Sequence, residues 1–213
     1  MAFVIAIAQR KGGAGKSTLA ATLATALASD GARVALLDTD PQKSLVRWHA
    51  ERAGALSQAA ALAFEDPSGW RVPAALDRLR KSYDFVLVDT PPHDDTDARL
   101  AIRGADLALV PLQPSHADLW ASEATLGMAK VEKTPVQLVL NRVPPTGKLR
   151  DEIQAALAAQ KLPVLDAMLG NRNAFPAAFA RGLGVTEAAP RSIAAEEARA
   201  LAASILRIAK KKG

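Results

Sequence analysis

The sequence predicts a single α/β domain: a doubly wound, mostly parallel β-sheet flanked by helices on both faces. The first observation is that short apolar runs alternate with longer helical patterns along all 213 residues, which favours parallel strands joined by helical crossovers. The second is that no apolar run approaches the roughly 20 residues that span a bilayer. The third is the lack of any internal repeat or low-complexity linker that would divide the chain.

The elements follow in order along the chain. Five apolar runs are expected to be strands buried on both faces, and they cover Phe3–Ala8, Arg33–Leu37, Phe85–Val88, Leu107–Val110 and Val136–Leu140. Helical patterns fall mainly at Ser17–Ser29, Val72–Lys81, Ala117–Val131 and Leu149–Gln160. The Pro-Pro pairs at 91–92 and 144–145 mark loops that leave strands. We therefore expect residues 1–213 to form one domain.

Composition excludes several classes of protein. The chain has no cysteine, which rules out disulfides, thiolate-bound iron–sulfur clusters and a cysteine nucleophile. No basic segment precedes the apolar run that begins at Phe3, so a signal peptide is not expected. These features are typical of a cytoplasmic protein.

The positive charge is concentrated in the last third of the chain. Residues 1–140 contain 15 Lys and Arg against 16 Asp and Glu, whereas residues 141–213 contain 12 against 6, which together give the net charge of +5. An ordinary solvated surface and a basic face for an anionic polymer such as nucleic acid are both compatible with this distribution.

Polar residues follow each predicted strand. Because ligands of open α/β sheets bind at the carboxyl ends of the strands, these segments together predict one site. After the first strand comes a glycine-rich loop; the later strands are followed by Asp38–Gln42, Asp89–Pro92, Pro111–Ser115 and Asn141-Arg142.

The glycine-rich loop predicts phosphate binding. Its glycines allow a tight turn that aims backbone N–H groups at phosphate oxygens, next to the positive end of a helix. In such loops the lysine, here Lys16, reaches the β- and γ-phosphates, and the hydroxyl of Ser17 binds Mg²⁺. The predicted nucleotide-binding residues of the loop are Lys11, Gly12, Gly13, Ala14, Gly15, Lys16, Ser17 and Thr18.

Three aspartates after the second and third predicted strands complete the predicted chemistry. Asp89 ends an apolar strand and fits the acidic residue that holds magnesium through water, and Asp40 is the candidate that orients the attacking water. The predicted magnesium residues are Ser17, Asp40 and Asp89. Asp38 is left open between the magnesium shell and a cap of the following turn or helix.

The loop departs from the usual pattern because Arg10 replaces its first glycine and Lys11 follows it. The combination Lys-Gly-Gly-x-Gly-Lys-Ser, Asp-x-Asp-Pro-Gln and Val-Asp-Thr-Pro-Pro resembles the deviant Walker ATPases of the ParA/MinD family. The resemblance extends over nearly the whole chain and is closest to the short, ParF-like ParA-type ATPases of partition and positioning. It implies hydrolysis of ATP to ADP and phosphate with Mg²⁺, slow alone and stimulated by a ParB-like partner protein.

The resemblance also assigns roles to three further residues. Lys11 would cross the interface of an ATP-bound homodimer to the partner's phosphates, so Lys11, Lys16 and Asp40 form the expected catalytic set. Asn141 and Arg142 would lie on the nucleobase side, with the Asn141 amide on adenine. A turn cap before the Pro-Pro pair remains an alternative for Asn141.

Long ParA proteins carry an N-terminal helix-turn-helix domain, but this chain starts at its first strand, so operator recognition is not expected. The resemblance implies a nucleoid-associated protein that binds DNA without sequence preference. The candidate phosphate contacts are Lys148, Arg150, Arg172, Arg181, Arg191, Arg199 and Arg207.

Two other functions of the same fold were weighed. A MinD-like membrane protein would use a C-terminal amphipathic helix, but the apolar stripe of residues 194–208 lacks Trp and Phe and is more typical of core packing. A MinD-like, membrane-associated positioning ATPase therefore stays open as the less favoured alternative. An ATP-dependent biosynthetic ligase would need an additional substrate pocket, and its relatives usually lack the lysine found here as Lys11.

Overall fold

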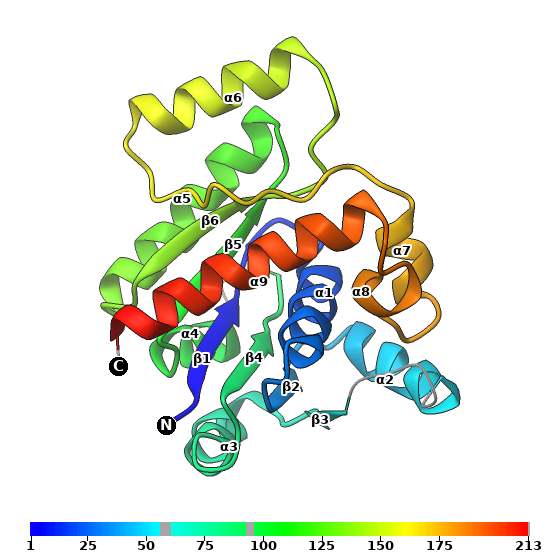
Figure 1. The fold of residues 1–213 in the computed structure, drawn as a ribbon. Coiled ribbons are helices and arrows are strands. Elements are labelled where there is room, and N and C mark those ends of the chain that lie inside the picture. The colour runs from blue at the N-terminus through cyan, green and yellow to red at the C-terminus, as the bar shows by residue number, and fades with distance from the viewer. Residues whose placement is uncertain (56–60, 93–95, 213) are drawn as a thin grey trace.

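The computed structural model describes residues 1–55, 61–92 and 96–212, and in this part of the chain six parallel strands form one sheet with helices on both faces (Figure 1). The strand order across the sheet is β3-β2-β4-β1-β5-β6. This arrangement confirms the predicted doubly wound α/β fold. The strands are β1 (Phe3–Ile7), β2 (Val34–Asp38), β3 (Leu62–Glu65), β4 (Phe85–Asp89), β5 (Leu107–Leu112) and β6 (Val136–Leu140).

The helices connect the strands and then close the chain beyond β6. Between strands lie α1 (Lys16–Ser29), α2 (Ser44–Gly54), a 3₁₀ turn (Gly69–Arg71), α3 (Val72–Leu79), α4 (Thr96–Arg103) and α5 (His116–Val131). After β6 come α6 (Lys148–Ala159), α7 (Ala174–Phe179), α8 (Val185–Ala188) and α9 (Ile193–Lys212).

Two hydrophobic layers sandwich the sheet because successive side chains of a strand point to opposite faces. In β1, Ile5 packs in the layer that holds α1, α7 and α9, whereas Val4 and Ala6 pack in the layer under α3 and α4. A third cluster joins β5 and β6 to α5 and α6. The strands therefore consist almost wholly of apolar residues, as the sequence predicted.

The C-terminal helix belongs to the core. Its predicted apolar stripe faces the layer around α1, where Ala194, Ala198, Leu201 and Ile205 are buried and Ile208 is partly buried. A stripe that is already buried against its own domain does not present a free membrane-binding face. No helix in the described part of the chain is long and apolar enough to cross a membrane.

Two strand predictions needed correction. Strand β3 was not predicted; it is a four-residue edge strand whose side chains are only partly buried, so it lacks a strong apolar pattern. The strand expected to end at Val110 continues to Leu112, because Pro111 and Leu112 stay in register with Val139 and Leu140 of β6. The polar segment after β5 consequently starts at Gln113.

Candidate functional site

Strand register brings three polar segments to one level of the sheet. Ile7, the last residue of β1, pairs with Asp89 at the end of β4, and Asp38 at the end of β2 pairs with the same residue. The glycine loop, the acidic segment after β2 and Asp89 therefore meet at the carboxyl edge, as the sequence predicted.

The phosphate loop surrounds a buried lysine. Gly13 and Gly15 have φ angles of 76° and 88°, in the left-handed region that favours glycine. Lys16 begins α1, is 7% exposed and donates to the carbonyl oxygen of Gln9 at 3.3 Å. Burial lowers the pKa of Lys16, and the carboxylates of Asp89 and Asp40 oppose this shift. The lysine thus lies as a partly desolvated cation between the loop and the aspartates.

A cavity of about 190 Å³ lies against this loop. A larger hollow of about 680 Å³ beside β3 contains none of the predicted site residues, so volume alone does not identify the functional cavity. The lining of the smaller cavity includes Gly12, Gly13, Gly15, Lys16, Ser17, Thr18, Asp40 and Arg142.

Asp89 has the properties of a cation ligand. It is fully buried, and neither carboxylate oxygen accepts a hydrogen bond of normal geometry in the described structure. Burial raises the pKa of Asp89 to about 7, with the neighbouring Ser17 hydroxyl opposing the shift and the Asp38 carboxylate adding to it. A buried carboxylate without a partner is costly unless a cation or donor satisfies it. Asp89 and Ser17 therefore fit a magnesium ion.

Asp38 caps the helix that follows the acidic segment. One of its carboxylate oxygens accepts from the backbone N–H groups of Leu45 and Val46 at 3.0 and 3.1 Å, in the first turn of α2. The other accepts from the N–H of Asp40 at 3.0 Å. Burial raises the pKa of Asp38, and these backbone hydrogen bonds oppose the shift. Of the two roles left open by the sequence, the structure shows the cap.

Asp40 faces the cavity from the same segment. Its side chain is 6% exposed, lines the 190 Å³ cavity and accepts from the N–H of Gln42 at 2.9 Å. Asp38 holds the backbone of Asp40 from one side and the start of α2 from the other. The position of Asp40 therefore depends on the same hydrogen bonds that start α2.

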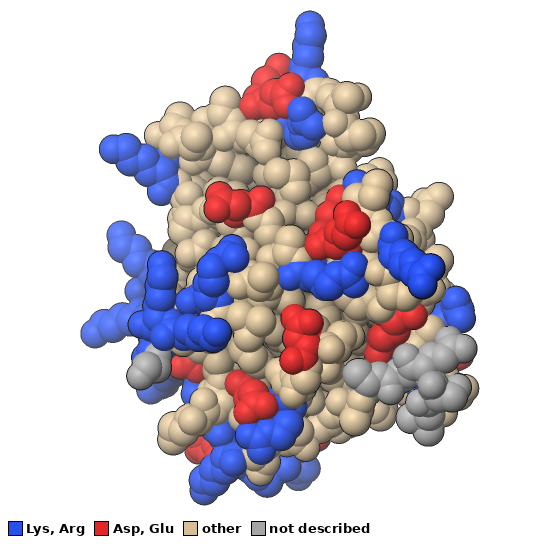
Figure 2. Space-filling model, viewed as in Figure 1, with Lys and Arg blue, Asp and Glu red and all other residues tan. Residues whose placement is uncertain are grey.

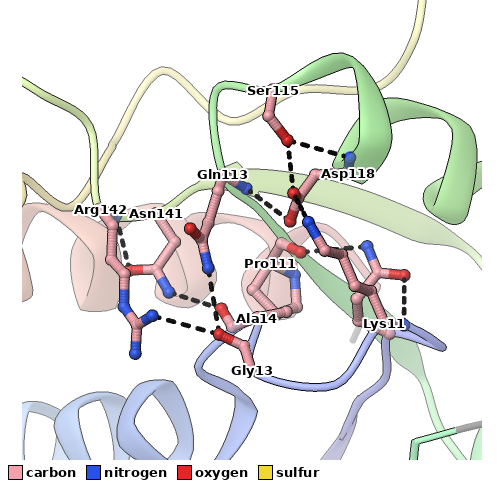
Figure 3. A network of polar contacts seen from close by, with 10 residues as sticks. Lys11, Gly13, Ala14, Pro111, Gln113, Ser115, Asp118, Asn141 and Arg142 are labelled. Carbon is pink, nitrogen blue, oxygen red and sulfur yellow. Dashed lines mark hydrogen bonds and ion pairs between the residues drawn. The ribbon is translucent and has the colours of Figure 1, made fainter.

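Lys11 forms an ion pair within its own chain. Its ammonium group contacts the carboxylate of Asp118, which is 1% exposed and lies in the first turn of α5 (Figure 3). The Asp118 carboxylate also accepts from the Ser115 hydroxyl. The resemblance placed this lysine on a partner subunit's phosphates, but in the single chain it lies on Asp118.

Three side chains at the ends of β5 and β6 contact the phosphate loop from outside. Gln113 and Arg142 donate to the carbonyl oxygen of Gly13 at 3.0 and 3.2 Å. Asn141 donates to the carbonyl oxygen of Ala14 at 2.9 Å (Figure 3). Sequence reasoning had predicted Asn141 and Arg142 near a nucleobase.

A second cavity of about 220 Å³ adjoins this region, and Asn141 and Arg142 are among its lining residues. It shares two lining residues, Thr18 and Arg142, with the phosphate-loop cavity. Leu169 and Phe175 give it an apolar side, and Arg172 also lines it.

Comparison with known families decides the relationship. The CobQ/CobB/MinD/ParA nucleotide binding domain matches residues 5–185. The chain belongs to the ParA/MinD family. The match begins within β1 and includes β2 to β6 and every polar segment described above.

Relatives of this ParA/MinD protein extend along most of its length. It is 32% identical over 206 residues to "Maintenance of carboxysome distribution protein A" of Halothiobacillus neapolitanus, covering 92% of each chain. The protein of the same name from Gloeobacter kilaueensis is 35% identical over 189 residues, covering 86% of this chain and 84% of its own. The septum site-determining protein MinD of Pyrococcus horikoshii, solved with Mg-ADP, has a TM-score of 0.80 at 21% identity, covering 100% of this chain and 99% of its own.

The basic residues predicted to contact DNA are dispersed in this ParA/MinD protein. Lys148 and Arg150 lie on α6, and the other five lie between residue 172 and the last turns of α9. Several are engaged: Arg172 pairs with Glu197, and Arg150 with Asp151.

Two residues of the site had no predicted role. Gln113 lies in a polar segment that was predicted to reach the site, but no function was predicted for its side chain, and none was predicted for Asp118. The Ser-x-x-Asp pattern at 115–118 predicts a helix start, and Ser115 does accept from the N–H of Asp118 at 3.1 Å. That pattern gives no indication of the contact with Lys11.

Proposed function

We propose that this protein is a ParA-type ATPase that hydrolyses ATP to ADP and phosphate with Mg²⁺ and positions a cargo. The observation that carries the proposal is the meeting of the phosphate loop, Lys16, Asp40 and Asp89 at the carboxyl ends of β1, β2 and β4. Phosphoryl transfer to water requires a phosphate-binding loop with its lysine, a carboxylate that holds magnesium and a group that orients the attacking water. The loop with Lys16, Asp89 and Asp40 can supply these parts in turn.

Each residue has a distinct part in this chemistry. Backbone N–H groups of the loop and the ammonium of Lys16 bind the phosphates, where their positive charge opposes the charge that develops in the transition state. Ser17 and Asp89 hold the magnesium ion, which when bound neutralises charge on the β- and γ-phosphates. Asp40, at the rim of the same cavity, orients the attacking water.

Dimerisation completes the site in this proposal. Lys11 is partly exposed next to the loop, and in the described part of the chain its ammonium group pairs with Asp118. In an ATP-bound homodimer it leaves Asp118 and neutralises phosphate charge in the partner subunit, as an arginine finger does. A single chain is then incomplete, which accounts for slow turnover and for stimulation by a ParB-like partner protein.

Basic surface supports binding of non-specific DNA on the nucleoid. The end of α9 carries three exposed lysines, Lys210, Lys211 and Lys212. In Figure 2 basic side chains gather at the left edge, where Figure 1 places the end of α9, whereas acidic and basic side chains alternate over most of that face. The candidates Arg181 and Arg191 are also exposed. Dimerisation doubles these charges on one body, so ATP would switch the affinity for the polyanion.

The names of two relatives favour a large protein assembly as the cargo. Both are named for carboxysome distribution and cover most of this chain. We therefore propose a cytoplasmic, nucleoid-associated protein that spaces such an assembly. A chromosomal deletion followed by counting and locating the assemblies in each cell tests this part. Unchanged distribution would exclude it.

The DNA part is tested by mobility-shift titration on unrelated duplexes with Mg-ATP, with Mg-ADP and without nucleotide. Binding is expected only with ATP, equal for all sequences, and weaker by roughly 0.9 log units per phosphate contact for each tenfold rise in salt. Lys210, Lys211 and Lys212 replaced together by Gln should weaken binding without changing ATP turnover. Equal binding in all three nucleotide states would contradict a switched DNA-binding face.

A further inference from the structure

The phosphate loop is held from outside by three side chains that reach its carbonyl oxygens. Gln113 and Arg142 both donate to Gly13, and Asn141 donates to Ala14, over distances of 2.9 to 3.2 Å. In Figure 3 the three side chains approach the loop from the ends of β5 and β6. We call Gln113, Asn141 and Arg142 the loop brace.

Peptide geometry makes these contacts relevant to phosphate. In a planar trans peptide the C=O and the following N–H point in opposite directions. A Gly13 carbonyl held toward the brace therefore turns the N–H of Ala14 the other way. The Ala14 carbonyl does the same for the N–H of Gly15. The brace fixes the direction of two backbone donors in the loop that borders the cavity.

The loop needs an external restraint because its own residues supply little. Gly12, Gly13 and Gly15 give it the turn, and glycine has the largest conformational freedom of all residues. A free loop would lose that freedom when phosphate binds, which weakens binding. Donors that are already oriented avoid this cost.

Asn141 is fixed in an orientation that serves the loop. It is 7% exposed, and its carbonyl oxygen accepts from the N–H of Arg142 at 3.0 Å. Because a backbone N–H requires an acceptor, the amide nitrogen must face the other way, toward Ala14. A Cβ at Gly15 would come within 2.7 Å of that nitrogen, so Asn141 approaches the loop as closely as glycine permits.

We propose that the loop brace positions the phosphate loop for binding, so that Gln113, Asn141 and Arg142 act on the phosphates through the loop. This inference rests on the proposed nucleotide site. It assigns Gln113, which no motif singled out, as a positioning residue. It also predicts that all three side chains affect the binding of every ligand that has a polyphosphate, with or without a base.

Calorimetric titration with ATP, GTP and inorganic tripolyphosphate tests the proposal. Gln113→Met keeps the length of the side chain and removes its donor. Loss of one hydrogen bond should weaken all three ligands by about two- to tenfold. Gln160→Ala, at the exposed end of α6, is the control and should bind as the wild type does. A cooperative thermal unfolding transition of Gln113→Met without ligand shows that the variant is folded.

A ligand without a base gives the second readout. Asn141→Ala should weaken tripolyphosphate as well as ATP and GTP, because tripolyphosphate contacts the loop but has no base. Loss confined to ATP would assign Asn141 to the base and overturn its role in the brace. If Asn141→Ala does not fold, Gln113→Met decides alone, and wild-type affinity of that variant for all three ligands would overturn the proposal.

Failure of the inference and failure of the proposed function give different results. Wild type that binds ATP, with Lys16→Ala that does not, supports the nucleotide site whatever the brace variants do. Wild type and Lys16→Ala that both fail to bind ATP and tripolyphosphate would overturn the nucleotide site and the brace together.

Discussion

The ammonium group of Lys11 pairs with the carboxylate of Asp118, a side chain that is only 1% exposed. Two further donors hold the same carboxylate, the hydroxyl of Ser115 and, at 3.4 Å, the N–H of Gln113. Asp118 is thus a buried anion with its own structural support, and Lys11 is its exposed and replaceable partner. A lysine with this position can leave one carboxylate for another anion at modest cost.

Lys11→Ala should separate nucleotide binding from dimerisation. We expect it to bind ATP as a single chain, because Lys16 and the loop are intact, and to remain a monomer with ATP. Light scattering with and without ATP gives the mass. The folding cost should be below the roughly 3 kcal/mol of a fully buried pair, because Lys11 is partly exposed and Ser115 and Gln113 still donate to Asp118. Lys130→Ala, exposed on α5, is the control. An ATP dimer of Lys11→Ala would remove the lysine from its proposed role.

Lys16→Ala should abolish nucleotide binding. The buried ammonium is the main positive charge that faces the cavity from α1, and alanine leaves Asp89 and Asp40 there without it. Calorimetric titration with Mg-ATP measures the effect directly. The neighbouring exposed Arg47→Ala should bind normally. Retained affinity in Lys16→Ala would place the nucleotide elsewhere.

Asp40→Ala should bind ATP and dimerise but lose turnover. The Asp40 carboxylate lines the cavity but is not part of the phosphate loop, and it takes no part in the hydrogen bond from Lys16 to Gln9. Its removal should therefore disturb the position of the attacking water more than the binding of the phosphates. Phosphate release in single-turnover conditions should fall by at least about tenfold, since a positioned acid or base group typically contributes 10²–10⁴-fold. Wild-type turnover of this variant would exclude the assignment.

A buried ion pair joins α2 to α8, and breaking it should lower the free energy of unfolding. Arg52 and Glu187 are each 4% exposed in their side chains and pair at 2.7 Å. Arg52→Met leaves the Glu187 carboxylate buried without its cation and should reduce the free energy of unfolding by about 3 kcal/mol. Arg78→Met, which breaks the exposed pair with Glu65, should cost much less, because solvent screens an exposed pair. Urea unfolding measures the free energy of unfolding of both variants. An equal loss in Arg52→Met and Arg78→Met would contradict the difference expected between a buried and an exposed ion pair.

Acid should remove the stabilisation provided by Asp84. The side-chain hydrogen bond from Arg33, assisted by the Arg33 backbone N–H, lowers the pKa of Asp84 to about 2 from 3.8. Because the folded value is lower than the unfolded one, the stabilisation is complete above about 4 and is lost as the pH falls toward about 2.

Urea unfolding of wild type and Asp84→Asn at several pH values measures this loss. The advantage of the wild type should shrink below about pH 4 and disappear near about pH 2. Asp77→Asn, exposed on α3, should show no such trend. A wild-type advantage that is independent of pH would contradict the role of the Asp84 carboxylate.

The local sequence was sufficient to predict which residues lie at the site when those residues are close together in the chain. The glycine loop, Lys16, Asp40 and Asp89 were predicted because a strand, a turn and a helix start leave a pattern in neighbouring positions. Contacts between segments left no such pattern. Gln113 meets Gly13 across 100 residues of chain, and only the adjacency of β1 and β5 in the sheet brings them together.

The misplaced features have physical reasons of the same kind. Strand β3 lies at the sheet edge and is half exposed, so its apolar pattern is weak. Asp38 could be assigned as a cap only once α2 was seen to place the N–H groups of Leu45 and Val46 against it. The sequence shows that the last third of the chain is basic, but it does not show that these charges are divided between helices such as α6 and α9.

The most direct test of the account is the mass of Asp40→Ala in sedimentation equilibrium with Mg-ATP, with Mg-ADP and without nucleotide. Blocked hydrolysis keeps ATP in the site during the measurement. The account predicts twice the mass of one chain with ATP and the mass of one chain in the other two states. A single-chain mass in all three states, with ATP binding confirmed by calorimetry, would contradict an ATP-switched dimer.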